Sequence, residues 1–135
     1  MRIIKQRFTI INMHRPYKST INEDLQWLGS SLGLFSLRDK DKSCFRIFIE
    51  LLKSAKRHQG LSSDEMAARL KLSRGTIIFH INKLASTGIV INDKNKYMLR
   101  VDSLKELINE IDKDLNRTMD RLKEVGDKID EQLGS

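Results

Sequence analysis

Apolar side chains recur along most of the chain with the spacing of an α-helix. The run CFRIFIELLKSAK, residues 44–56, is apolar around most of its circumference, so it predicts a helix that other elements cover on several sides. Residues 21–35 predict an earlier helix, because Thr20 and Glu23 have the spacing of a capping box. The charged segment SLRDKDKS between them predicts a connector.

Two short helices joined by a tight turn follow this pair. Ser62 and Glu65 form a second capping-box pattern before SDEMAARLK, and Ser73 can cap a helix over residues 73–87. Helices this short and this closely joined cannot lie antiparallel. They are predicted to cross steeply, as in a helix-turn-helix.

The second helix of the pair has one apolar stripe, and its other side is the candidate nucleic-acid surface. Ile77, Ile81 and Leu84 recur at helical spacing and are predicted to face the core. The candidate DNA contacts of this helix are therefore Ser73, Arg74, Gly75, Thr76, Ile78, Phe79, Asn82 and Lys83. The helix N-terminus suits a phosphate, Arg74 suits guanine or phosphate, and Asn82 suits adenine or is only a solvated surface amide.

Two β-prone runs, IVIN and YMLRV, flank the polar turn DKNK and predict a hairpin over residues 89–100. Its tip carries Lys94 and Lys96, which are candidates for contact with a nucleic-acid backbone.

From Asp102 onward the pattern changes to a heptad that keeps one phase for more than four repeats. It predicts a coiled coil or a long docked helix. The candidate dimerisation residues are Leu104, Ile108, Ile111, Leu115, Leu122, Val125 and Ile129. The flanking charges show no clean pairing, so strand number and orientation stay open.

These patterns divide the chain into three parts and predict a mainly helical fold with one small β-hairpin. Residues 1–19 are a basic arm or strand. Residues 20–100 form a helix-turn-helix domain with an additional N-terminal helix, and residues 101–135 form a dimerisation helix.

Charge separates the body from the tail. Residues 1–100 carry 19 Lys and Arg against 8 Asp and Glu, a net +11, whereas residues 101–135 carry 6 against 10, a net −4. A basic body suits an anionic partner, and an acidic tail would be repelled by that same partner. Arg38, Lys40, Lys42 and Arg46 are candidates to extend the basic face.

Other classes of function find little support in the composition. The single cysteine, Cys44, lies in an apolar run, and the three histidines are far apart in sequence, so no metal or disulfide is expected. No phosphate-binding glycine loop occurs, and neither an enzymatic activity nor a cofactor is expected. The apolar runs are too short and too interrupted to span a bilayer, and no signal-peptide pattern opens the chain, which favours a cytoplasmic location.

The order of elements over residues 42–100 resembles the winged-helix transcription regulators of bacteria and archaea, of the ArsR/MarR kind. The matching positions in LSSDEMAARLKLSRGTIIFHINKLASTGIV are Ser73, Thr76, Ile77, His80, Ile81, Leu84, Gly88, Ile89 and Val90. The resemblance implies that helix 73–87 enters the major groove and that wing 89–100 touches the minor groove or the backbone. It implies a regulator, and the tail predicts that it acts on DNA as a homodimer.

Ile78 and Phe79 depart from the family pattern, which has polar residues there. They would contact thymine methyl groups in DNA, or be covered by residues 1–35, another subunit or a partner protein. The alternatives to a DNA-binding regulator are therefore a protein–protein interaction module that lacks specific DNA binding, and a binder of structured RNA.

Overall fold

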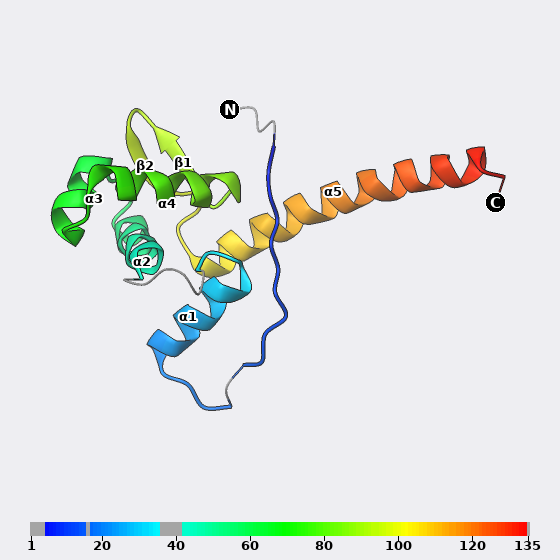
Figure 1. Ribbon diagram of the computed structural model, residues 1–135. Coiled ribbons are helices and arrows are strands. Elements are labelled where there is room, and N and C mark those ends of the chain that lie inside the picture. The colour runs from blue at the N-terminus through cyan, green and yellow to red at the C-terminus, as the bar shows by residue number, and fades with distance from the viewer. Residues whose placement is uncertain (1–4, 16, 36–41, 135) are drawn as a thin grey trace.

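Five helices and one two-stranded hairpin make up the protein in the computed structural model, which describes residues 5–15, 17–35 and 42–134 (Figure 1). The mainly helical class with a small β-hairpin is confirmed. In chain order the elements are α1 (Ile21–Ser31), α2 (Ser43–Lys56), α3 (Ser63–Leu70), α4 (Arg74–Ser86), β1 (Val90–Asp93), β2 (Lys96–Leu99) and α5 (Leu104–Gln132).

Four of the helices begin after a hydroxyl residue that caps them, and three of these residues, Thr20, Ser62 and Ser73, are the ones predicted from the sequence. The side chains of Thr20, Ser62, Ser73 and Ser103 each accept a hydrogen bond from the backbone N–H three residues later. At Thr20 and Ser62 the glutamate at that position accepts the cap residue's own N–H, which completes a capping box. Helix α1 ends at Ser31, earlier than the predicted residue 35, because Gly33 takes a left-handed φ of 69° and turns the chain back.

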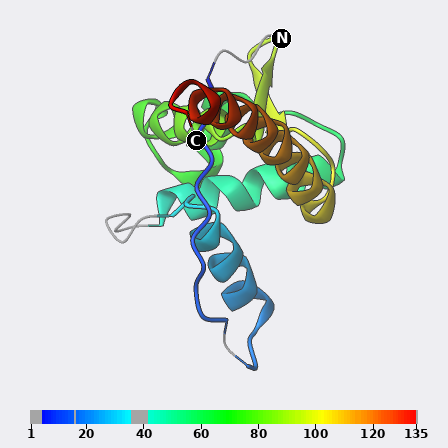
Figure 2. The same ribbon diagram turned by 90° about the vertical axis from the view of Figure 1, so that its right-hand side faces the viewer.

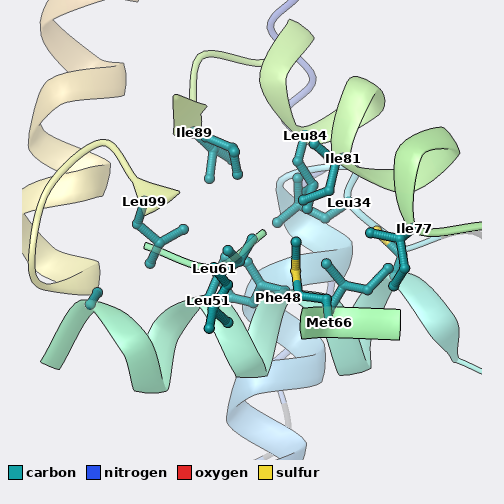
Figure 3. Packing of buried hydrophobic residues seen from close by; sticks show 14 of the residues in the cluster. Leu34, Phe48, Leu51, Leu61, Met66, Ile77, Ile81, Leu84, Ile89 and Leu99 are labelled. Atoms are coloured by element: carbon teal, nitrogen blue, oxygen red, sulfur yellow. The ribbon is translucent and has the colours of Figure 1, made fainter. Parts of the chain in front are cut away.

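Helix α2 packs against α3, α4 and β2, and the buried apolar side chains lie between these elements (Figure 3). Ile47, Phe48 and Leu51 of α2 are fully buried. The complete set of buried apolar side chains is Leu34, Cys44, Ile47, Phe48, Leu51, Ala55, Leu61, Met66, Leu70, Ile77, Ile81, Leu84, Ile89, Val90, Leu99, Leu107 and Ile111. Cys44 is thus a small buried side chain, as its apolar surroundings in the sequence predicted.

The hairpin is antiparallel, with Val90 opposite Leu99 and Asp93 opposite Lys96. Lys94 and Asn95 form its two-residue turn and both have positive φ, 51° and 65°, as a type I′ turn requires. Leu61 forms an isolated antiparallel bridge to β2, because its N–H and C=O both bond to the backbone of Tyr97, at 2.9 and 2.7 Å. This bridge ties the start of the helix-turn-helix to the wing.

The N-terminal segment is an arm across the body. Residues 5–15 contain neither helix nor strand. The backbone N–H of Arg7 donates to Ser86 at the end of α4, and that of Ile11 donates to Ser31 at the end of α1. The arm therefore connects two helix ends, and it also passes α5 (Figure 1).

Helix α5 projects away from the body (Figures 1 and 2). Its 29 residues span about 43 Å. Only Leu107, Ile111 and Asp114 are buried, and all three lie in its first half. The helix is therefore anchored at one end, and its second half extends into solvent.

Candidate nucleic-acid interface

The orientation of α4 decides which of its side chains can reach a partner. Ile77, Ile81 and Leu84 are 0% exposed, so the stripe predicted to face the core does so. The other side of the helix is open to solvent. Of the predicted contacts on it, Ser73, Arg74, Gly75, Phe79 and Asn82 are exposed, and Thr76, Ile78 and Lys83 are partly buried.

The N-terminus of α4 is open and positively polarised. The Ser73 hydroxyl accepts the N–H of Thr76 at 3.1 Å and bonds to its hydroxyl at 2.8 Å, so both side chains are engaged in capping. A Cβ on Gly75 would meet only the Ser73 hydroxyl, at 4.0 Å, so the backbone here is accessible. The first-turn N–H groups and the helix dipole suit an anion at this end.

Arg74 adds a movable cation at the same end of the helix. Its side chain is 73% exposed, and its Nε lies 3.9 Å from the carboxylate of Asp64, whose side chain is itself 82% exposed. An ion pair this exposed contributes little, so the guanidinium can leave it for a phosphate or a base edge.

Lys71 is a second cation at this end, which the sequence analysis did not single out. It forms the left-handed C-cap of α3, with φ 56° and ψ 44°, and lies exposed in the turn before α4. The sequence signal that could have indicated Lys71 is its place two residues before Ser73, the N-cap of α4.

Phe79 is the apolar feature of this surface. Its side chain is 68% exposed, and its ring meets the His80 ring edge-on at a centroid distance of 5.2 Å. Ile78 is partly buried, so of the two unexpected apolar residues Phe79 is the more accessible. The described residues of the chain leave most of the Phe79 ring uncovered.

The lysines of the wing and of the last turns of α4 differ in the contacts that their ammonium groups make. Lys94 lies exposed in the hairpin turn. The ammonium of Lys96 instead donates to the Glu65 carboxylate, which joins the wing to α3. Lys83 points back to the body, with its ammonium 3.5 Å from the Leu34 carbonyl oxygen. Arg38 and Lys40 lie outside the described residues, and the Arg46 guanidinium donates to the Leu70 carbonyl.

The Lys96–Glu65 contact makes stability depend on pH. The hydrogen bond from Lys96, followed by the backbone N–H of Ser62, lowers the pKa of Glu65 from 4.5 to about 2. A lowered pKa means that the unfolded chain binds the proton more tightly. The contribution is therefore complete above about pH 4.5 and is lost as the pH falls toward about 2.

Glu65→Gln tests this linkage, because the amide oxygen can still accept the Ser62 N–H while the charge is gone. We expect the original protein to have the higher thermal midpoint near neutral pH. The gap between the two midpoints should close as the pH is lowered through that window. A gap that stays constant down to about pH 2 would contradict the assigned ion pair.

The described part of the chain has two further properties that bear on function. It contains no group of three or more His, Cys, Asp or Glu side chains placed to hold a metal ion. None of its helices is both long and apolar enough to cross a membrane.

An exposed helix after a tight turn, followed by a hairpin wing, defines a winged helix-turn-helix domain. A comparison with protein families agrees: residues 46–91 match the family model described as winged helix-turn-helix DNA-binding. The match runs from α2 to β1 and confirms the winged-helix resemblance. It does not separate the ArsR/MarR kind from others, which stays a prediction. Searches of curated proteins and of solved structures gave no match.

Proposed function

We propose that this protein is a sequence-dependent transcriptional regulator that binds double-stranded DNA through α4 and the wing. The observation that carries the proposal is the complete burial of Ile77, Ile81 and Leu84 in a domain that matches a DNA-binding family. This burial leaves the opposite side of α4 free to enter a major groove. Such a protein acts in the cytoplasm beside the DNA and needs neither cofactor nor catalytic activity.

Each exposed group has a proposed part in binding. The α4 N-terminus and Lys71 face a phosphate, and Lys94 on the wing faces the backbone or the minor groove. Arg74 donates to guanine and Asn82 pairs with adenine. Phe79, with Ile78 beside it, packs on thymine methyl groups. Lys96 acts indirectly, because its ion pair with Glu65 fixes the position of the wing.

We further propose that α5 pairs with α5 of a second copy. Its stripe changes character along its length. Leu107 and Ile111 are covered by the chain's own body, whereas Met119, Leu122, Val125 and Ile129 are 42–60% exposed on the projecting half. The apolar repeat continues although the described residues of the chain do not cover it, which favours a partner with the same repeat.

Not every predicted dimerisation residue is available for that contact. Ile111 is only 6% exposed, and Leu104 packs against the chain's own core. The proposed contact therefore centres on the distal half of α5. Two-fold pairing there would present two α4 helices to sites about 34–36 Å apart, one turn of DNA.

A salt titration of binding to a mixed-sequence DNA duplex tests the central proposal. About six phosphate contacts predict a slope of about −5 for log K against log salt, because that many counterions are released. An absence of binding at low salt would overturn it. The absence of DNA binding would instead favour a protein–protein module in which Phe79 contacts a polypeptide. If duplex RNA competes with DNA and binds more strongly, the RNA alternative is favoured.

A further inference from the structure

The base of α5 holds a buried carboxylate in an otherwise apolar attachment. Leu107 and Ile111 pack into the core, and Asp114, one turn later, is 5% exposed. Asp114 lies where the covered half of the helix gives way to the projecting half. A buried carboxylate is costly unless it is paired, so its partners show what it does.

Asp114 receives hydrogen bonds from three directions. Arg100, which follows β2, donates both guanidinium Nη groups to it, the second at 3.2 Å, and also reaches Glu110 at 3.2 Å. Arg117 donates from the next turn of α5. The Gln6 side chain donates from the arm at 3.0 Å. The hydrogen bond from Arg100 is the main cause that lowers the pKa of Asp114, so the carboxylate is charged at neutral pH.

Gln6 extends this cluster to the recognition helix. Its side-chain amide also donates to the Thr87 carbonyl at the C-cap of α4, at 3.0 Å. Gly88 gives it space: φ there is +82°, and a Cβ would come within 2.3 Å of the Gln6 Nε2. At the same place the Arg100 backbone N–H donates to the Ile89 carbonyl, at 2.9 Å. The end of α4, the base of the wing and α5 thus meet at one set of polar contacts.

We infer that Gln6, Arg100 and Asp114 form a joint that fixes the direction in which α5 leaves the body relative to α4. Apolar contacts such as those of Leu107 and Ile111 have no preferred direction, so they hold the helix on the body but resist tilting weakly. Charge-assisted hydrogen bonds are directional. Tilting α5 would break the hydrogen bonds that Arg100 and Gln6 donate to Asp114, although Arg117 would move with the helix. The Arg100 guanidinium and the buried carboxylate would lose each other, which is strongly unfavourable.

The consequence for DNA rests on the proposed function. If two α5 helices pair, the direction of each sets the separation of the two α4 helices, and with it the spacing of the half-sites. Gln6, Arg100 and Asp114 are then positioning residues, since none of them lies on the DNA-facing side of α4.

The joint can be tested within one chain, without DNA and whether or not the chains form dimers. Spin labels at Asn82→Cys on α4 and Glu124→Cys on α5 report their separation by pulsed dipolar spectroscopy, in a Cys44→Ala background. Dilution with unlabelled chains leaves at most one labelled chain in any dimer. The unaltered joint should give one narrow distance distribution.

Asp114→Asn is expected to widen that distribution about twofold, because it removes the charge on which the arginines converge. Asp112→Asn, an exposed position two residues earlier on the same helix, is the matched control and should leave it narrow. Equal widths for the two variants would overturn the joint.

Gln6→Ala removes only the bridge to α4 and serves as a second variant if Asp114→Asn does not fold. It should widen the distribution while circular dichroism shows the helices intact, and an unchanged width would overturn the proposed bridge. The result separates from the proposed function: a rigid joint in a protein that fails to bind DNA leaves the joint standing, and a DNA-binding protein with a loose joint refutes only the joint.

Discussion

Arg74→Ala is expected to weaken DNA binding by about 5- to 150-fold. The basis is that a bidentate arginine–guanine contact contributes about 1–3 kcal/mol and each 1.4 kcal/mol is a factor of ten. The guanidinium lies at the first residue of α4 and is 73% exposed, so its loss should leave the fold unchanged. If Arg74 contacts a phosphate instead, the salt slope should become shallower by about one per chain. Titrations of both proteins at several salt concentrations distinguish the two roles.

Arg121→Ala is the matched control, because it removes the same charge from the exposed surface of α5. If binding depended only on net charge, both variants would lose affinity equally, and the proposed role of α4 would be contradicted. We expect a loss for Arg74→Ala alone, with equal thermal midpoints for the two variants.

The parts of the fold that local patterns determine could be predicted from the sequence. Capping residues at Thr20 and Ser62 mark helix starts because the groups that satisfy a first turn lie within three residues of it. The orientation of α4 follows from Ile77, Ile81 and Leu84, since a helix with one apolar stripe has one side to bury. The outward side of α4 could therefore be predicted from the sequence.

Contacts between distant residues could not be predicted in this way. Lys96 is 31 residues from Glu65, and Gln6 is 108 residues from Asp114. Neither contact produces a periodic pattern in the sequence. Nothing in the sequence indicated the Lys96–Glu65 ion pair, because only the packing of the wing on α3 brings the two charges together.

The heptad of α5 shows the same limit. One frame fitted residues 101–132, and it could not distinguish positions covered by the chain's own body from positions left bare. Leu107 is not among the predicted dimerisation residues of the heptad. It is nevertheless 0% exposed, because the start of α5 packs on the body and this side chain points into the core. Asp114, a charge in a heptad, gave no sign that it would be buried.

Leu122→Lys is expected to reduce the molar mass in solution from that of two chains to that of one. Leu122 is 60% exposed, at the middle of the bare stripe and two turns beyond Asp114. A buried leucine contributes about 1.5–3 kcal/mol, and a two-fold pair loses two of them and gains two buried ammonium groups. Light scattering over a range of protein concentrations measures the change. A point substitution is better than cutting the chain before Asp102, which would remove Leu107 and Ile111 from the core.

Asn116→Lys provides the control, because it adds the same charge at an exposed position of α5 away from the stripe. It should keep the mass of two chains. A single-chain mass for the unaltered protein, or equal masses for the two variants, would contradict pairing through this stripe. Leu122→Lys should retain the salt-dependent binding of the body to a single half-site, since α4 and the wing are untouched. What it should lose is the gain in affinity that two linked half-sites provide.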